Sequence, residues 1–424
     1  MGNVLLSGDV ERASKCDDVA DMSWGLEVRK VRAVARTGAV VALLGAALVG
    51  CQSGQGKGRT SALPEAGQTE ETAVSLQVTP RNGSRGVLPT DRVRVSSKDG
   101  VVKDVVVVGS AVGPVRGSIA DGEWLSARGQ SLTLGAEYHV YALVDDAKGH
   151  THSVVSTFHT LADKDVLKTL IAPFNGEKVG VGMPVMVFFT AKVKDRAAVE
   201  SKLSVNVATG NAAAAPIEGA WHWFSDKEVH FRPRVYWPAH SEVTVNLDLA
   251  GVNAGNGVRG LKSRVLKFSV GSSHISLVDA EKHNMVVQED GKVIRTLKVS
   301  TGRPKYPSQS GVHVVISKSN PEIMDSATVG IPRNSPDGYY EKVPNSVRIS
   351  YGGAFVHSAS WSVRDQGVRN VSHGCVNVSP ADAAWFFDLV KRGDVVDIVN
   401  AKAPPLKSDP GMSDWNIPFS EWAN

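Results

Sequence analysis

The chain has 424 residues and few cysteines: Cys16, Cys51 and Cys375 are its only three. Secreted domains that disulfides hold together are short and carry cysteines in larger, even numbers. A disulfide framework is therefore excluded, and each of the three thiols needs an explanation of its own. The length is also too great for a single hydrophobic core, so about three domains are expected.

The chain also has little excess charge and no run of apolar residues long enough to cross a bilayer. The formal net charge is +4 at pH 7, and neither a polybasic run nor a basic–aromatic stripe occurs, which argues against nucleic-acid binding. The longest apolar stretch, GAVVALLGAALVG at residues 38–50, is shorter than the ~20 residues that a spanning helix needs. Glycine, in contrast, is abundant with 41 residues, which fits a β-rich protein with many turns.

Cationic residues precede the apolar stretch, and this order is typical of a secretory signal peptide, which we expect over residues 1–50. The stretch ends in LVGC at residues 48–51, which resembles a bacterial lipobox. In lipoproteins of that kind the chain is cut before the cysteine, whose thiol then carries a lipid; the alternative is an ordinary signal peptide with a chance cysteine. Because residues 1–21 are rich in acids, which such signals lack, we expect translation to begin at Met22 or this segment to be dispensable. The cationic residues are Arg29, Lys30, Arg32 and Arg36.

These expectations place the mature protein at the cell membrane, anchored by a lipid on Cys51 and facing the cell wall. Residues 51–72 are rich in Gly, Ser, Gln and Glu and would form a flexible tether, with an end-to-end distance of roughly 25 Å. Cys16 would be lost with the precursor, which leaves Cys375 as the one thiol of the mature domains. A lone thiol outside the membrane has no partner within its own chain, so it needs another reason to be there.

Short segments with period-two alternation, separated by turn residues, begin at about residue 73 and are typical of antiparallel sandwiches. An internal repeat runs through them. The run PRNG at 80–83 returns as PFNG at 173–176, and other pairs recur in the same order at offsets of about 93 to 110 residues, close to the length of an Ig-like domain. We therefore predict two tandem Ig-like β-sandwiches, over residues 73–161 and 162–272. A spacer role is the simplest interpretation of both, and ligand binding is the alternative.

A third, β-rich domain is predicted over residues 273–400. It contains further alternating segments and one helix, expected from Pro380 to Lys391 because Ser379 is a suitable N-cap and proline a suitable first residue. The aromatic side chains of residues 401–424 are expected to pack back onto this domain. The predicted fold class is therefore mainly β: two Ig-like sandwiches, then a β-rich catalytic domain with a short helix after its cysteine.

One stretch of the third domain carries the residues of a nucleophilic site. The run FVHS at 355–358 is followed by SHGCVN at 372–377, with fourteen residues between His357 and Ser372. A cysteine nucleophile reacts as the thiolate and needs a neighbouring base, and a histidine suits that role near neutral pH. Gly374 allows close backbone approach, so amides near it could face a developing oxyanion. Acyl transfer by a Cys–His pair is the first interpretation; a zinc ion held by Cys375 and the two histidines and a purely structural thiol are the alternatives.

This spacing of His and Ser-His-Gly-Cys-Val-Asn is similar to the signature of the L,D-transpeptidase catalytic domain, and the resemblance extends over about residues 273–424. Two sandwiches behind a lipobox resemble the mycobacterial members, as do Trp361 with its neighbours and MDS at 324–326. Two departures occur. Val329 stands where similar enzymes carry a lid tyrosine, and SQSG at 308–311 replaces the commoner Thr-Pro-x-Gly, which we interpret as a structural change.

The resemblance implies a role for each site residue. Cys375 would be the nucleophile and His357 its base, oriented by the backbone carbonyl of Ser358. The donor stem peptide would bind under a lid of about residues 320–345. In this scheme the oxyanion hole is built by His373, Gly374 and Cys375 with the Tyr339 hydroxyl, the donor pocket is lined by Met324, Tyr339 and Trp361, backbone contacts to the stem peptide come from Gly352 and Gly353, and Asn377 holds the loop and touches substrate.

The family's reaction forms a 3→3 cross-link between peptidoglycan stem peptides through a cysteine thioester, releasing D-alanine from a tetrapeptide donor. No metal or organic cofactor is implied, and carbapenem β-lactams are expected to acylate Cys375. The nearest alternative is an L,D-carboxypeptidase with water as acceptor, and exclusion of water, which the motif does not reveal, decides between the two. A non-enzymatic lipoprotein that binds peptidoglycan is a further alternative, against which the intact Cys–His pair argues.

Overall fold

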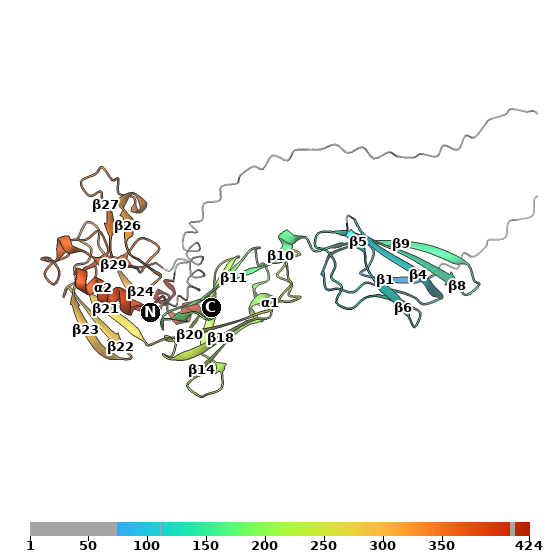
Figure 1. Ribbon diagram of the computed structural model, residues 1–424, viewed down its shortest axis with the longest axis horizontal. Helices are drawn as coiled ribbons and strands as arrows, with labels where there is room; N and C mark the ends of the chain where they lie inside the picture. Colours follow the sequence, from blue (N-terminus) through green and yellow to red (C-terminus); the bar gives the residue numbers. More distant parts are fainter. Residues whose placement is uncertain (1–73, 111, 408–411) are drawn as a thin grey trace, which may run out of the picture. The chain divides into compact units, whose positions relative to one another are not determined.

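The computed structural model describes residues 74–424, except residue 111 and residues 408–411 (Figure 1). The predicted signal peptide, the predicted tether and Cys51, which is expected to carry a lipid, lie outside the described residues. Strands dominate the described part, in three successive β-rich regions. None of the helices in this part is long and apolar enough to cross a membrane.

The first region is a sandwich of two sheets, with strand orders β1-β3-β7-β6 and β2-β9-β8-β4-β5. Alternate side chains of β8, from Tyr138 to Val144, are buried between the sheets because successive residues of a strand point to opposite faces. Trp124 from the other sheet joins the same core. The strands are β1 (Leu76–Thr79), β2 (Ser84–Val87), β3 (Arg94–Ser97), β4 (Gly100–Gly109), β5 (Val112–Pro114), β6 (Gly117–Ala120), β7 (Glu123–Ser126), β8 (Glu137–Asp146) and β9 (Thr151–Thr160).

The second region repeats this plan, with sheets β11-β13-β17-β16 and β12-β20-β18-β14-β15 and the small pair β10-β19. Trp237 and Phe268 are fully buried in its core. The elements are β10 (Val166–Leu167), β11 (Thr169–Ala172), β12 (Lys178–Val179), β13 (Val185–Phe189), α1 (Arg196–Glu200), β14 (Leu203–Thr209), β15 (Ala215–Pro216), β16 (Gly219–Ser225), β17 (Glu228–Pro233), β18 (Ser241–Leu247), β19 (Arg259–Gly260) and β20 (Arg264–Val270).

The repeat seen in the sequence forms a turn, here called the Asn-Gly corner, that makes the same hydrogen bonds in both sandwiches. In the first, the Asn82 side chain accepts from the amide of Thr157 (2.9 Å), and the amide of Gly83 donates to the carbonyl of the same threonine (2.7 Å). In the second, Asn175 and the glycine after it bind Lys267 in the same way (3.0 and 2.7 Å). Both glycines have positive φ, which explains why Asn-Gly recurs.

The third region is built on a six-stranded sheet, β23-β22-β21-β31-β24-β32, and a four-stranded sheet, β25-β28-β29-β30. Both sheets contribute valines and isoleucines to one buried core, which helix α2 also joins. The hairpin β26–β27 stands apart from these sheets (Figure 1). The strands are β21 (His274–Asp279), β22 (Asn284–Glu289), β23 (Lys292–Lys298), β24 (Gln309–Val314), β25 (Ser317–Ser319), β26 (Glu322–Asp325), β27 (Tyr340–Val343), β28 (Ser346–Arg348), β29 (Phe355–Ser358), β30 (Val376–Val378), β31 (Val395–Val399) and β32 (Ala403–Pro405).

Helix α2 (Pro380–Leu389) begins where the sequence predicted and ends two residues before Lys391. Its N-cap is Ser379, whose hydroxyl accepts from the amide of the third helical residue (3.1 Å). The end was misplaced because Val390 is extended, with φ −81° and ψ 152°. The Lys318 ammonium donates to the carbonyl of this valine (2.9 Å) and so supports the end from another strand.

The C-terminal segment contacts two regions, of which the sequence predicted only one. Strand β32 pairs with β24 of the third region. Further on, Trp422 is fully buried against the second sandwich. Its indole N–H donates to the carbonyl of Ala220 (2.8 Å), and its ring stacks on His222 with 4.7 Å between centroids. Two short elements form this part, the 3-10 helix Asp414–Asn416 and helix α3 (Phe419–Trp422).

Candidate functional site

The Cys375 thiol and the His357 imidazole line the same cavity, and two parallel strands of the four-stranded sheet place them there. Strand β30 pairs with β29 in a register that sets His357 opposite Asn377. Cys375 precedes Asn377 by two residues, so both point to the face that His357 occupies. Val356 and Val376 point to the other face and are buried in the core. The valine core thereby fixes the side of the sheet on which the reactive groups lie.

His357 is buried, with 3% of its surface exposed. Its Nδ1 lies 2.9 Å from the carbonyl oxygen of Ser358. Since a carbonyl only accepts, Nδ1 carries the proton and Nε2 keeps its lone pair. Burial lowers the pKa of this imidazole to about 4, and the bond to Ser358 only partly opposes that shift. The ring is therefore neutral near pH 7 and able to accept a proton at Nε2.

The Cys375 thiol donates to the backbone carbonyl of Gly353, with 3.7 Å between the sulfur and the oxygen. Burial raises the pKa of the thiol to about 11, and a backbone hydrogen bond with Phe355 and the charge of Arg348 lower it by less. The resting pair is thus a thiol and a neutral imidazole. Attack on a carbonyl requires the proton to move to His357 as the new bond forms.

Two serines hold the loop that carries the cysteine. The Ser372 hydroxyl donates to the carbonyl of Cys375 (2.6 Å) and accepts from the amide of Gly374 (3.1 Å). The Ser308 hydroxyl donates to the carbonyl of Gly374 (2.7 Å). Gly374 has φ +124°, which only glycine adopts without strain. Its amide, predicted to face the oxyanion, is bonded to Ser372 in this structure.

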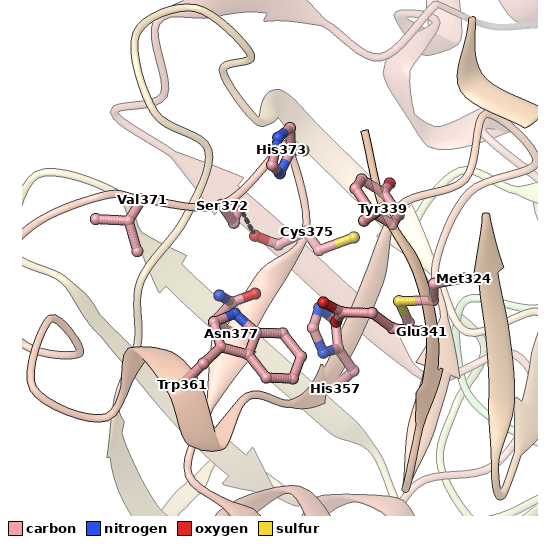
Figure 2. Close-up of a pocket in the computed structure, with 10 residues that line it drawn as sticks. All are labelled: Met324, Tyr339, Glu341, His357, Trp361, Val371, Ser372, His373, Cys375 and Asn377. Atoms are coloured by element: carbon pink, nitrogen blue, oxygen red, sulfur yellow. Dashed lines mark hydrogen bonds between the residues drawn. The ribbon is translucent and has the colours of Figure 1, made fainter. Parts of the chain in front are cut away.

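The thiol opens into a cavity of about 210 Å³ (Figure 2). The cavity contains both histidines and brings together Met324, Tyr339 and Trp361, the side chains expected in the donor pocket. Trp361 is 58% exposed, so it forms part of the rim. The lining residues are Met324, Tyr339, Glu341, His357, Trp361, Val371, Ser372, His373, Cys375 and Asn377.

The predicted lid is the hairpin β26–β27 and the turn between its strands. Met324 and Glu341 are cross-strand partners in this hairpin, and both line the cavity. The turn is held by Arg333, whose guanidinium binds the Asp325 carboxylate with two contacts of 2.8 and 2.5 Å. Burial raises the pKa of Tyr339, the last residue of the turn, to about 12, so its hydroxyl stays protonated at neutral pH.

A second cavity, of about 290 Å³, reaches Cys375 from the side of the predicted backbone-contact residues Gly352 and Gly353. Gly353 has φ +92°, and a Cβ added there would lie 2.9 Å from the Val329 side chain. Val329, which was noted as a departure from the family pattern, therefore packs directly against this glycine. Met324 and Tyr339 border both cavities, so two lid residues lie between the two approaches to the sulfur.

Asn377 holds the loop from inside the fold. It is 2% exposed, its side-chain amide donates to the Ser362 hydroxyl (3.1 Å), and its backbone pairs with Ser300. Across residues 74–110, 112–407 and 412–424, no group of three or more His, Cys, Asp or Glu side chains is arranged to hold a metal ion.

The sequence did not single out several residues that shape the site. Glu341 lines the cavity, and Arg303 donates to Nε2 of His373 (2.8 Å). Neither belongs to a motif, and only tertiary contact brings them to the cysteine loop. Ser308 was noted as a departure from the family pattern, but its bond to the carbonyl of Gly374 could be found only in the structure.

Comparison with known proteins gives one consistent result. The profile described as the L,D-transpeptidase catalytic domain matches residues 273–398, and that of the bacterial Ig domain matches residues 84–253. The protein named L,D-transpeptidase 2 from Mycobacterium tuberculosis is 34% identical over 376 residues, which cover 88% of this chain and 90% of the relative. The protein named L,D-transpeptidase 1 from the same species is 38% identical over 229 residues, covering 54% of this chain and 83% of the relative.

Solved structures also match the chain, among them two L,D-transpeptidases. One is described as an L,D-transpeptidase in complex with imipenem; it is 38% identical, covers 55% of this chain and 98% of its own, and has a TM-score of 0.47. The other is described as an L,D-transpeptidase from Mycobacterium smegmatis; it is 34% identical, with coverage of 55% and 98% and a TM-score of 0.45.

Proposed function

The chain belongs to the L,D-transpeptidase family, and from that premise we propose that it forms 3→3 cross-links between peptidoglycan stem peptides through a thioester on Cys375. The observation that carries the proposal is that the Cys375 thiol and the His357 imidazole line the same cavity, His357 from β29 and Cys375 from the position just before the parallel strand β30. An oriented neutral imidazole beside a lone thiol is the arrangement that acyl transfer needs.

In the first step the sulfur of Cys375 attacks the carbonyl carbon of the third residue of a donor tetrapeptide. The thiol proton moves to Nε2 of His357, and Ser358 stabilises the resulting imidazolium through Nδ1. The tetrahedral intermediate collapses, the bond to the terminal D-alanine breaks, and His357 returns the proton to the leaving amine. A thioester remains.

In the second step the side-chain amine of an acceptor stem attacks the thioester carbonyl. His357 takes a proton from that amine and returns it to the departing sulfur, so the free thiol is restored. The two cavities that meet at Cys375 support separate approaches for donor and acceptor. Met324, Tyr339 and Trp361 would contact the donor, and the backbone of Gly352 and Gly353 would contact a stem peptide.

The oxyanion of each intermediate needs hydrogen-bond donors near the carbonyl that is attacked. The amide of Cys375 and the hydroxyl of Tyr339 are the donors we assign, with His373 beside them. Gly374 would contribute mainly through its backbone conformation, because its amide is bonded to Ser372. Asn377 would keep the loop in register with β29.

The test is a reaction of the purified protein with disaccharide-tetrapeptide, followed by mass spectrometry. We expect a dimer that is lighter than two monomers by one alanine, and no dimer from Cys375→Ala. Full activity in Cys375→Ala would refute the mechanism. Since the change is small and the residue lies in a cavity, circular dichroism serves as the control for folding.

An L,D-carboxypeptidase remains the second candidate, because the same thioester reacts with water if water reaches it. The observation that bears on it is that two cavities reach Cys375. Tripeptide as the main product of the same reaction would favour this candidate over cross-linking.

The N-terminal part of the proposal concerns location. The run LVGC at residues 48–51 supports a lipid on Cys51, attachment to the cell membrane and a position facing the wall. We expect the protein in the membrane fraction and a Cys51→Ala protein outside that fraction, as measured by immunoblotting. Equal amounts of both proteins in the membrane fraction would contradict the anchor.

A further inference from the structure

A polar cluster outside the cavity connects the lid to the site histidine. The Asp337 carboxylate, in the turn of the lid, accepts from the Lys305 ammonium (2.5 Å), the Tyr306 hydroxyl (3.0 Å) and Nη2 of Arg303. The same Nη2 lies 2.8 Å from Nε2 of His373. One guanidinium nitrogen therefore touches the lid on one side and the site on the other.

The contact with Arg303 determines where His373 carries its proton. A guanidinium only donates hydrogen bonds, so Nε2 of His373 must accept, and the neutral ring carries its proton on Nδ1. Burial first, and the charge of Arg303 second, lower the pKa of this imidazole, while Asp337 opposes them. Tyr306 and Tyr339 flank the ring, with centroids 5.1 and 5.2 Å away.

The guanidinium is itself held in place at some cost. Within the described part of the chain, Nε of Arg303 is buried and has no hydrogen-bond partner. A cation in such a position depends on its carboxylate, because removing one partner leaves the other charge uncompensated. The hydrogen bond from Lys305 is the largest cause that lowers the pKa of Asp337, to about 2, so this carboxylate keeps its charge across the physiological range.

We propose that Arg303 is a positioning residue that fixes His373 as the neutral tautomer protonated on Nδ1, and that the lid residue Asp337 holds Arg303 in this orientation. His373 lines the cavity, so Nδ1–H is the donor that this ring offers there. Only the kinetic consequence rests on the proposed function. The position of the lid and the orientation of the Nδ1–H donor are then coupled, because both depend on the Arg303 guanidinium.

The direct test is nuclear magnetic resonance of the purified protein labelled with ¹⁵N at the histidine ring nitrogens. The His373 signals are identified by their loss in His373→Gln. We expect a protonated Nδ1 and an unprotonated, hydrogen-bonded Nε2 that stay so as the pH falls through 6.5, the ordinary histidine pKa. A proton on Nε2, or titration near that ordinary value, would overturn the proposal whether or not the enzyme turns over.

The variant test uses Arg303→Met, Arg303→Lys and Asp337→Asn. In Arg303→Met we expect exchange between the two tautomers, a higher pKa for His373 and a fall in kcat/KM of at least about tenfold, the value of one charge-assisted hydrogen bond. A new loss of activity should also appear on the acid side of the pH profile. Arg303→Lys should restore the tautomer in part, and Asp337→Asn should show a smaller shift in the same direction.

Arg333→Met is the matched control. It also removes an arginine–aspartate pair from the lid, that of Arg333 with Asp325, but this arginine is bonded to that carboxylate and not to His373. We expect wild-type ring signals and a wild-type pH profile from it. If Arg303→Met and Arg333→Met lowered activity alike with unchanged His373 signals, Arg303 would be only a structural part of the lid. If Arg303→Met failed to fold, the tautomer of the wild-type ring would still decide.

Discussion

At the scale of single residues, the thiol of Cys375 and the imidazole of His357 are both uncharged at neutral pH. Burial raises the pKa of the Cys375 thiol to about 11 and lowers the pKa of the His357 imidazole to about 4. An ion pair would require both shifts to be reversed. The site therefore contrasts with cysteine sites that hold a preformed thiolate, which an adjacent cation stabilises. Reactivity here depends on proton transfer within the complex with substrate.

This difference predicts an unusual pH profile. Because the pKa of His357 is about 4, we expect the rate at which a carbapenem acylates Cys375 to stay level from neutral pH down to about pH 5 and to fall only near pH 4. Mass spectrometry of the adduct measures the rate. A decline centred near pH 6.5, the ordinary histidine value, would contradict the uncharged pair.

Unfolding at low pH must be distinguished from a slower acylation reaction, because protonation of His357 also affects stability. Between about pH 6.5 and pH 4 the unfolded chain binds a proton at His357 that the folded chain does not bind. The free energy of unfolding therefore decreases as the pH falls through that window. Circular dichroism at each pH shows whether the protein is still folded when acylation slows.

The sequence predicted which residues meet but not their protonation. The Cys375–His357 pair was found from the spacing of a short motif, and the family resemblance added Asn377, whereas the parallel pairing of β29 with β30 is seen only in the structure. The charge state depends on burial, which arises from lid, loop and sheet together. For the same reason nothing in the sequence pointed to Arg303, which reaches His373 from a separate loop.

At the scale of elements, the cysteine loop is held by a neighbouring segment that departs from the family pattern. Ser308 is 2% exposed, and its hydroxyl joins the amide of Gly302 (2.9 Å) to the carbonyl of Gly374 (2.7 Å). Without it, both backbone groups lose a partner. This departure was expected to be structural, and the two hydrogen bonds of Ser308 support that expectation.

We predict that Ser308→Ala lowers the free energy of unfolding by about 1–3 kcal/mol, the cost of leaving buried polar groups unsatisfied. Activity should fall as well, because the backbone of Gly374 is less constrained. Ser310→Ala is the control, since among the described residues its hydroxyl makes only a long contact of 3.4 Å with the carbonyl of Ala403. Denaturant unfolding measures the effect on stability, and the acylation rate measures the effect on activity. Equal stabilities and equal rates in the two variants would refute this role of the Ser308 hydroxyl.

The elements also show where sequence patterns stop being informative. The start of α2 was predicted because Ser379 and Pro380 form a local capping signal. Its end was missed because Lys318, distant in sequence, binds the carbonyl of Val390. The sandwich repeat was visible because the same Asn-Gly corner closes both sandwiches.

At the scale of the whole molecule, residues 412–424 join the second sandwich to the third region. His230 of the sandwich is fully buried and lies 3.0 Å from both the Asp414 and the Glu228 carboxylates. Arg232 lies beside it against the rings of Trp415 and Trp422, 4.9 and 4.8 Å from their centroids. The aromatic residues of this segment were predicted to pack on the third region, and in the structure they cover a charged face of the second sandwich.

The contact of residues 412–424 with the second sandwich, here called the clasp, makes the free energy of unfolding decrease as the pH rises. Burial lowers the pKa of His230, but Asp414 and Glu228 outweigh it and raise the pKa to about 9. The folded chain therefore holds a proton that the unfolded chain loses above about pH 6.5. The contribution is complete below that pH, and we expect the Tm to decrease as the pH rises from about 6.5 to 9.

Differential scanning calorimetry across this range measures the effect, and His230→Gln, which does not titrate, is the comparison. The variant should unfold at a lower temperature at pH 6.5 and lose most of the dependence. An unchanged alkaline slope in His230→Gln would assign the effect to another group.

The clasp also has a consequence for biosynthesis. Trp422 binds Ala220, 202 residues earlier in the chain. At ribosomal rates, roughly 10 to 40 seconds pass between the two residues. During that interval His222 and Arg232 of the nascent second sandwich have no cover from the segment that later closes over them. A premature stop within this segment would release a protein with every reactive residue present and the sandwich still open.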